Sequence, residues 1–180
     1  MPHEVLCCHE ELSHWGRFIV LLVPSKLKVS CLRICIAYYS LTGNTETCSR
    51  NLEKLLKDMG HDITCNKVEN IADVEEYDMV VIGFPVHCLN MPKKVKEFLN
   101  RIELREKPTY LFCTYALFGS ARALSMAKEI VKRRGGKLMG QSAIKARPSL
   151  LIFLGLKPSV SMHQLSLFLE DIKRKLHTVS

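Results

Sequence analysis

The stretch YYSLTGNTETCSRN, Tyr38–Asn51, decides the fold class, because it joins an apolar strand pattern to a helical pattern through a short polar loop. The run that leads into it, RICIAYY, is rich in Ile and Tyr and predicts a buried strand. After the loop, apolar residues recur at helical spacing until Gly60, where a glycine that ends a helix is expected. A strand that passes directly into a helix indicates the start of a crossover between parallel strands.

The same alternation continues to residue 146 and predicts five parallel strands joined by helices, an open doubly wound α/β sheet. Four further runs read as strands, the first of them an edge strand: HDITCNKV, DMVVIGF (Asp78–Phe84), TYLFCTY from Thr109, and KLMGQSAIKA. Three further helices are expected, and their buried residues are Val95, Phe98, Leu99 and Ile102; Leu124, Ala127, Ile130 and Val131; and Leu165, Phe168, Ile172 and Leu176. Ser161 and Gln164 have the spacing of a capping box for the last helix.

Two segments do not follow the alternation. Residues 1–30 form an N-terminal extension of unknown role, which leaves 31–180 as one domain in this chain of 180 residues. The apolar segment Arg147–Pro158 has a proline near each end, and we expect it to be a loop that packs on the core or near a ligand. The apolar run Phe18–Val23 is much shorter than the roughly 20 residues of a membrane span and lacks signal-peptide features, so we expect a cytoplasmic protein without membrane contact.

The eight cysteines do not predict disulfides or a metal site, because no Cys-x-x-Cys pair occurs among them. The group His3, Cys7, Cys8, His9 and His14 also lacks the spacing that places two ligands on one helix face. We therefore expect no metal.

The formal net charge of +8 and the pI near 9.1 raise the question of nucleic acid. The basic residues are mixed with Glu along expected helix faces, and no zinc-finger or RNA-recognition pattern accompanies them. A solvated basic surface is the preferred interpretation, and no nucleic-acid partner is expected.

The polar loop has the chemistry of an anion site at the start of a helix. Gly43 lets the backbone approach a ligand, and the loop contains no Lys or Arg. A phosphate monoester bound by neutral donors suits this composition, whereas the missing Gly-Lys-Ser/Thr ending and Gly-x-Gly-x-x-Gly pattern disfavour a nucleotide-hydrolase loop and a dinucleotide site. An ordinary helix cap is the alternative. The candidate binding residues here are Ser40, Leu41, Thr42, Gly43, Asn44 and Thr45, with side-chain donors from Ser40, Thr42, Asn44 and Thr45.

SLTGNT resembles the Ser/Thr-x-Thr-Gly-x-Thr phosphate loop of the flavodoxin family and lies after the first strand as it does there. YDMVVIGFPVHCLNMPKKVKEFL is similar to the family's third strand, flavin-contacting loop and next helix. YALFGSARALSMAKEIVKRRGGKLMG is similar to its second flavin loop, the helix after it and the start of the fifth strand. The likeness spans about Arg33–Ala146 and is greatest to flavodoxin-like domains of anaerobic bacteria and archaea. It implies strand order 2-1-3-4-5, helices on both faces of the sheet, and FMN as cofactor.

The resemblance also implies that the isoalloxazine ring lies between two loops, and simple loop packing is the alternative for each residue. Many flavodoxins stack the ring between Trp and Tyr, but the single Trp of this chain, Trp15, falls outside the matching region. Tyr115 or Phe118, with His87 or Met91 opposite, would take that place. The implied ring contacts are Pro85, Val86, His87, Leu89 and Asn90 on one side, and Tyr115, Phe118 and Gly119 on the other.

Three functions stay open from the sequence. The first is an FMN electron carrier whose partner is a redox protein such as a ferredoxin or a flavodoxin reductase. The second is an NAD(P)H- or quinone-linked oxidoreductase in which Leu150–Leu156 and His87 line a substrate pocket. The third is a binding module without flavin. Flavodoxin carriers are acidic whereas this chain is basic, so we expect a raised flavin potential and acidic partners. The sequence predicts neither the oligomeric state nor whether the protein is an enzyme.

Overall fold

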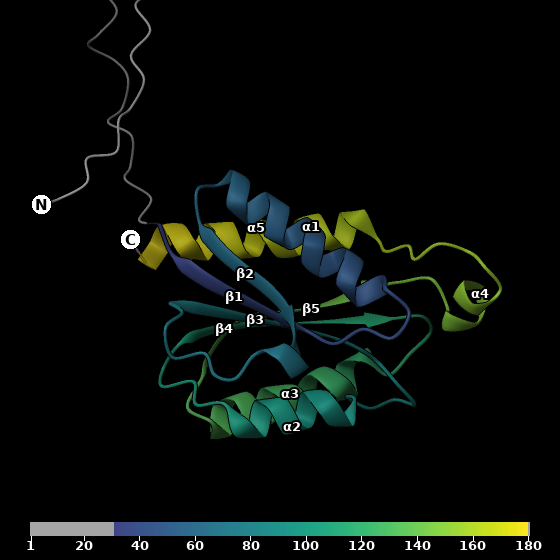
Figure 1. The fold of residues 1–180 in the computed structure, drawn as a ribbon, viewed down its shortest axis with the longest axis horizontal. Helices are drawn as coiled ribbons and strands as arrows, with labels where there is room; N and C mark the ends of the chain where they lie inside the picture. The colour runs from purple at the N-terminus through teal and green to yellow at the C-terminus, as the bar shows by residue number, and fades with distance from the viewer. Residues whose placement is uncertain (1–30, 180) are drawn as a thin grey trace, which may run out of the picture.

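A computed structural model describes residues 31–179, which form a parallel sheet covered by helices on both faces (Figure 1). The strand order β2-β1-β3-β4-β5 confirms the predicted doubly wound topology, with β2 at an edge. The predicted extension 1–30, with its His and Cys group and the single Trp, lies outside the described residues. The strands are β1 (Arg33–Tyr38), β2 (Asp62–Lys67), β3 (Met79–Pro85), β4 (Pro108–Tyr115) and β5 (Lys137–Lys145).

The helices form two layers, one on each face of the sheet (Figure 1). One layer contains α1 (Asn44–Asp58) and α5 (Met162–Val179), and the other contains α2 (Lys93–Arg101) and α3 (Ser120–Arg133). A short 3-10 helix, η1 (Val68–Asn70), comes directly after β2. None of the helices in the described part is long and apolar enough to span a membrane.

Each face of the sheet has its own apolar core, as the helical spacing predicts. Burying a Leu or Phe side chain contributes about 1.5–3 kcal/mol to the free energy of unfolding, so the buried residues of the helices hold both helix layers on the sheet. The expected core residues are buried in α2 and α3 and in the first three turns of α5: Val95, Phe98, Leu99, Ile102, Leu124, Ala127, Ile130, Val131, Leu165, Phe168 and Ile172. Leu176 is only partly buried.

The start of α5 uses half of the predicted capping box. Ser161 Oγ accepts a hydrogen bond from Gln164 N at 3.4 Å, as expected. Gln164 Oε1, however, accepts from Lys145 N at 2.6 Å rather than from Ser161. Ser161 N donates instead to Lys145 O at 2.8 Å. The capping residues therefore also fasten α5 to the end of β5.

The segment Arg147–Pro158, which was expected to be a loop that packs on the core or near a ligand, is only in part a loop. It contains a short helix, α4 (Ser149–Phe153), which protrudes beyond the sheet (Figure 1). Phe153 and Leu154 are 78% and 70% exposed. Both ends of the segment Arg147–Ser159 contact the start of α1, because Asn44 donates to Arg147 O and accepts from Ser159 N, while α4 projects from the carboxyl edge of the sheet (Figure 1).

Candidate functional site

The Ser40–Thr45 loop ends at a helix start that no side chain caps. Gly43 is the N-cap of α1 and has the left-handed φ of 82°, which glycine adopts without steric cost. Ser40 Oγ accepts a hydrogen bond from Gly43 N at 3.1 Å and so closes the turn. The first N–H groups of a helix need acceptors from outside the helix. This arrangement suits a bound anion better than it suits an ordinary capped turn.

Besides Ser40, two of the four expected side-chain donors have hydrogen-bond partners within the protein. Thr45 Oγ1 lies 2.8 Å from Thr114 Oγ1 in a buried pair that ties α1 to β4. Asn44 Nδ2 donates to Arg147 O at 2.8 Å, and Asn44 Oδ1 accepts from Ser159 N at 3.0 Å. Asn44 and Thr45 therefore position the loop, while the half-buried Thr42 lies at the candidate site.

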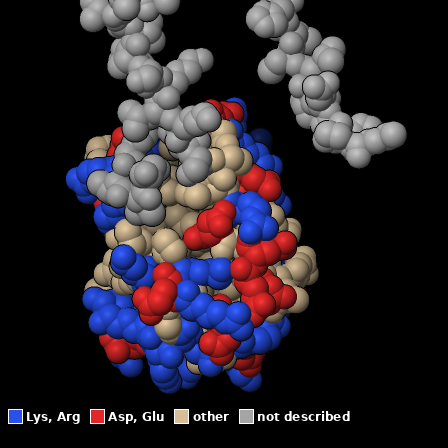
Figure 2. All heavy atoms as spheres, turned by 90° about the vertical axis from the view of Figure 1, so that its left-hand side faces the viewer, with Lys and Arg blue, Asp and Glu red and all other residues tan. Residues whose placement is uncertain are grey.

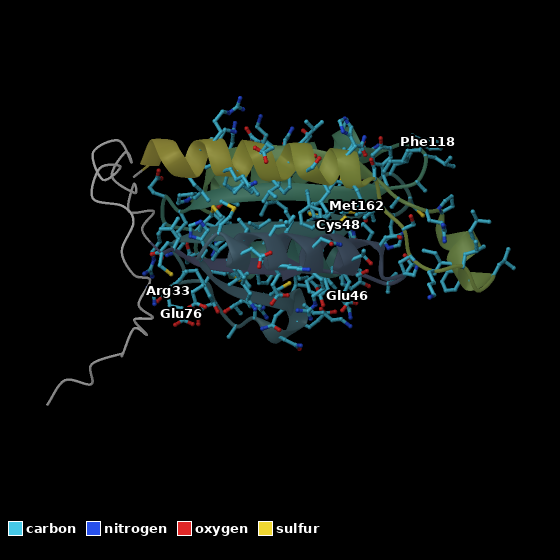
Figure 3. All side chains as sticks on the ribbon, turned by 90° about the horizontal axis from the view of Figure 1, so that it is seen from above. Arg33, Glu46, Cys48, Glu76, Phe118 and Met162 are labelled. Atoms are coloured by element: carbon cyan, nitrogen blue, oxygen red, sulfur yellow. The ribbon has the colours of Figure 1, made fainter. Side chains whose placement is uncertain are left out.

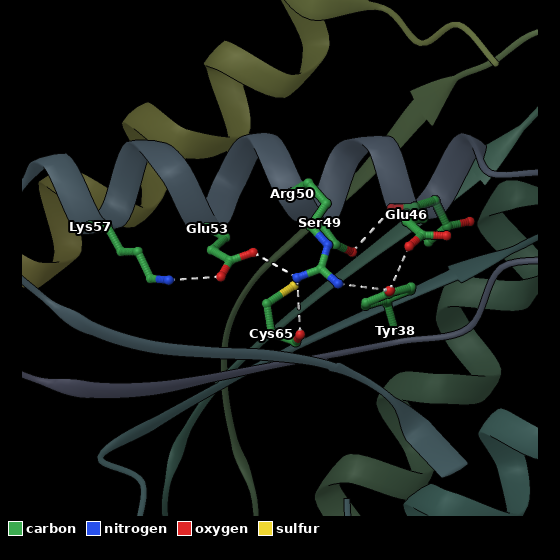
Figure 4. Close-up of polar contacts among 8 residues, drawn as sticks. Tyr38, Glu46, Ser49, Arg50, Glu53, Lys57 and Cys65 are labelled. Atoms are coloured by element: carbon green, nitrogen blue, oxygen red, sulfur yellow. Dashed lines mark hydrogen bonds and ion pairs between the residues drawn. The ribbon is translucent and has the colours of Figure 1, made fainter. Parts of the chain in front are cut away.

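A polar network holds α1 in place behind this loop (Figure 4). Tyr38 Oη donates to Glu46 Oε1 at 2.9 Å, and burial, with this bond as the second cause, raises the pKa of Tyr38 to about 12. Arg50 donates to Glu53 Oε2 at 2.9 Å and to Cys65 O on β2 at 3.2 Å. The network joins α1 to β1 and β2, which fixes the helix start relative to the sheet.

The Pro85–Met91 loop is a tight hairpin with an unusual backbone. His87 N donates to Asn90 O at 3.0 Å, and Asn90 N donates to His87 O at 2.7 Å. The two residues between them, Cys88 and Leu89, have positive φ values of 45° and 66°. Turns of this shape favour Asn-Gly, and a non-glycine residue held there costs of order 1–3 kcal/mol. The hairpin is therefore a site of backbone strain.

The Tyr115–Ser120 loop touches this hairpin. Gly119 has a φ of 92°, and a Cβ at this position would lie 2.9 Å from Leu89 Cα and 3.3 Å from Val86 Cγ1. The absence of a side chain at Gly119 thus permits the close approach of the two loops. Phe118 is 68% exposed and lies at the carboxyl edge, at the opposite end of the sheet from Arg33 (Figure 3).

The three predicted segments line one small cavity of about 40 Å³ at the carboxyl edge of the sheet. A volume of this order holds a water molecule or a small polar group. Seven of the predicted residues line it: Leu41, Thr42, Asn44, Pro85, Val86, His87 and Tyr115. The other seven lie outside its lining: Ser40, Gly43, Thr45, Leu89, Asn90, Phe118 and Gly119.

Four lining residues were missing from the prediction: Thr114, Ala116, Ala146 and Arg147. Thr114 and Ala116 flank the predicted Tyr115, so the end of the strand β4 could have indicated them from the sequence. Arg147 comes from a segment whose position depends on Asn44, and sequence spacing contains no signal for that contact. Arg147 Nη1 also donates to Lys157 O at 2.5 Å, which stabilises the base of the segment.

His87 is a titratable residue that lines the cavity. Burial lowers the pKa of its imidazole, so the neutral form is favoured. Its Nε2 is buried and has no hydrogen-bond partner within residues 31–179, which leaves it able to meet a polar ligand atom. Met91, the expected alternative to His87 for stacking, is only 6% exposed and packs in the core, so it cannot stack on a ring at the surface.

The residues present fit both ends of FMN. At one end, an uncapped helix start and neutral hydroxyl groups suit a phosphate. At the other, Leu89 and Phe118 expose apolar surface, and the unpartnered His87 Nε2 lies nearby. No group of three or more His, Cys, Asp or Glu that could hold a metal ion occurs in the described part of the chain. The fold and site define a doubly wound α/β protein with a ligand site at the carboxyl edge of its sheet.

Comparison with known proteins assigns the family. The sequence profile of the flavodoxin domain matches residues 35–142, and this chain belongs to that family. A flavodoxin from Megasphaera elsdenii is 27% identical over 119 residues, which cover 63% of this chain and 86% of that protein.

Solved structures share the fold of this chain. The two-electron reduced M. elsdenii flavodoxin has 26% identity and a TM-score of 0.55, covering 61% of this chain and 84% of that one. Oxidised flavodoxin 2 from Bacillus cereus has 23% identity and a TM-score of 0.63, covering 79% and 99%. Rubredoxin oxygen:oxidoreductase from Desulfovibrio gigas, at 17% identity and a TM-score of 0.61, shares the fold over 81% of this chain and 36% of that one.

Proposed function

We propose that this chain binds FMN and transfers electrons to and from another redox protein, such as a ferredoxin or a flavodoxin reductase. Membership of the flavodoxin-domain family supports the general role. The observation that carries the proposal is the meeting of the Ser40–Thr45, Pro85–Met91 and Tyr115–Ser120 loops around one cavity. Bound FMN supplies the redox chemistry, and the protein supplies binding and orientation.

The residues divide into two groups in this proposal. Ser40, Thr42 and the amides of the α1 start bind the phosphate without a positive charge. Leu89 and Phe118 offer apolar surface to the ring, and His87 offers a polar contact. Thr45 and Asn44 act indirectly, since their side chains hold β4 and the Arg147–Ser159 segment against the loop.

Purification without added cofactor tests the proposal. We expect a visible flavin spectrum, FMN after acid release, and loss of FMN in Thr42→Ala. Ser125→Ala, an exposed hydroxyl on α3, is the matched control and should retain FMN. A colourless protein that also fails to bind added FMN would contradict the proposal and favour a binding module that has lost flavin.

The basic character of the chain leads to an expectation for the flavin potential. A positive environment favours the anionic reduced flavin, so the second-electron potential should be less negative than in acidic flavodoxins. A spectroelectrochemical titration measures it directly. A very negative potential for the second electron would contradict this expectation.

An NAD(P)H- or quinone-linked oxidoreductase is the second candidate, and the Arg147–Ser159 segment is the observation that favours it. Arg147 and His87 line the same cavity, and the segment that begins at Arg147 exposes the apolar side chains of Phe153 and Leu154. An apolar substrate could use that surface. Steady-state oxidation of NAD(P)H by the FMN-loaded protein alone would support this candidate, whereas a carrier requires a separate reductase.

A further inference from the structure

We infer that the groove between α2 and α3 is the docking surface for an acidic protein partner. This inference rests on the proposed electron-transfer function, because it assigns that function's partner to one face of the molecule. The groove has a volume of about 550 Å³ and begins at the end of the Pro85–Met91 loop. Its lining residues are Asn90, Met91, Lys93, Lys96, Glu97, Asn100 and Met126.

The net charge of the protein is concentrated in the layer that forms this groove. Residues 92–137, which contain α2, β4 and α3, have twelve Lys and Arg against four Asp and Glu. This is the largest basic excess in the chain, since residues 138–180 have six basic against two acidic residues. Residues 31–91 have the opposite balance, five basic against nine acidic. The molecule is therefore charged asymmetrically, and Figure 2 shows Lys and Arg gathered on the lower part of the surface, where α2 and α3 lie.

Many of these cations are not neutralised by the protein itself. Lys94 pairs with Glu69 at 2.8 Å, and Lys93 lies 3.6 Å from Glu97. Arg101 and Lys107 donate only to backbone carbonyls. Within residues 31–179, six more make neither an ion pair nor such a bond: Lys96, Arg122, Lys128, Lys132, Arg133 and Lys137. Uncompensated surface charge of one sign attracts a partner of the other sign and speeds association.

The groove combines charge with an apolar floor. Lys96 lines it from α2, and Met126 lines it from α3. Arg122 is exposed and lies four residues before Met126, so both are on the same face of α3. An apolar centre with a polar rim is typical of protein interfaces, and methionine is enriched in them.

The position of the groove favours a redox protein over other polyanions. Asn90 and Met91 belong to both the groove and the loop expected to contact the flavin. A partner seated there would lie next to the candidate site, whereas a nucleic acid or a lipid surface would gain nothing from that proximity.

Binding of an acidic ferredoxin tests this surface. We would titrate the protein as purified with that ferredoxin at low ionic strength by calorimetry, and compare Lys96→Glu/Arg122→Glu with the unchanged chain. We expect the double variant to weaken binding at least tenfold, and added salt to reduce the difference. The matched control is Lys54→Glu/Lys67→Glu, which makes the same charge change at exposed positions on α1 and β2 and should weaken binding less than threefold.

Three outcomes would overturn the inference. The first is an equal effect of both double variants, which would indicate a general charge effect, and the second is absence of binding to the ferredoxin. The third is loss of affinity for heparin or anionic vesicles in the groove variant with unchanged ferredoxin binding. Flavin content measured on the same samples separates this test from the proposed function, because docking is measured whether or not FMN is bound.

Discussion

Two loops at the carboxyl edge of the sheet bring the backbone into the left-handed region by different means. The Ser40–Thr45 loop uses Gly43, at φ 82°, and is surrounded by hydrogen bonds from its own side chains. The Pro85–Met91 loop has Cys88 and Leu89 at φ 45° and 66°, where no glycine relieves the strain. The Ser40–Thr45 loop is therefore held by hydrogen bonds, whereas the Pro85–Met91 loop is strained next to the expected flavin ring.

The difference indicates that hydrogen bonds fix the conformation of the Ser40–Thr45 loop, whereas the Pro85–Met91 loop keeps an unfavourable backbone conformation. A third region gives a reference, since Arg105 and Glu106 also have positive φ values, of 42° and 60°, far from the candidate site in the fold. Strain of this kind is therefore not restricted to the candidate site. The Pro85–Met91 loop is distinguished by Leu89, which also contacts the second predicted flavin loop at Gly119.

Gly43→Ala should have the largest effect and would break the rigid loop. The alanine would be held at a positive φ, which costs about 1–2 kcal/mol, and its Cβ would lie 2.8 Å from Pro158 Cγ. We expect FMN affinity to fall about 100-fold, measured by fluorescence titration of the flavin. Gly60→Ala is the control, because its φ is 88° but no atom lies within 4 Å of the added Cβ. It should lose stability without losing FMN affinity, and equal loss of affinity in both variants would contradict the interpretation.

Thr45→Val tests whether hydrogen bonds hold that loop. The change leaves the buried Thr114 hydroxyl without its partner, which costs about 1–3 kcal/mol of unfolding free energy. Urea unfolding of the flavin-free protein measures it. Thr45→Val/Thr114→Val should recover part of the loss, since no hydroxyl is then left unpaired. Strict additivity of the two single changes would show that the pair is not coupled.

Cys88→Asn/Leu89→Gly should relieve the strained hairpin. Asn-Gly suits a two-residue turn with positive φ at both positions, so we expect the unfolding free energy to rise by about 1 kcal/mol. Arg105→Asn/Glu106→Gly removes similar strain elsewhere and should stabilise by a similar amount. Only the change at Cys88 and Leu89 should alter FMN affinity. If both alter it alike, the strain at the hairpin has no special relation to the site.

The smallest effect should be a pH dependence from two histidines, the buried His61 and the half-buried His87. Burial lowers the pKa of His87 and His61 in the folded state, so the unfolded chain takes up their protons more readily. Stability should therefore be constant above about pH 6.5, the ordinary pKa of histidine, and fall as the pH drops below it. Melting temperatures between pH 5 and 8 should show this slope, with a shallower one in His87→Gln. An unchanged slope would assign the effect to His61 and other groups.

The sequence predicted which loops form the candidate site, but it did not predict the hydrogen bonds between them. The Ser40–Thr45 loop and the two expected flavin loops were found because each comes after a strand with a clear apolar pattern, and parallel strands end at one edge. The roles of Asn44 and Thr45 could not be found in this way. Their partners, Arg147 and Thr114, are 103 and 69 residues away in sequence, and polar side chains of this kind serve loops and ligands equally well.

The sequence by itself determined the order and type of the elements, because hydrophobic spacing and helix-ending glycines are local properties of the chain. It also determined the family, through the SLTGNT loop and the strings around the two later loops. Tertiary structure alone decided that the Thr45 hydroxyl and the Asn44 amide bond other parts of the protein. It also decided that the strained hairpin at Leu89 contacts Gly119. Tertiary structure further placed α2 and α3, whose cations already lie together in residues 92–137, side by side in one layer, because crossover connections put both helices on the same face of the sheet.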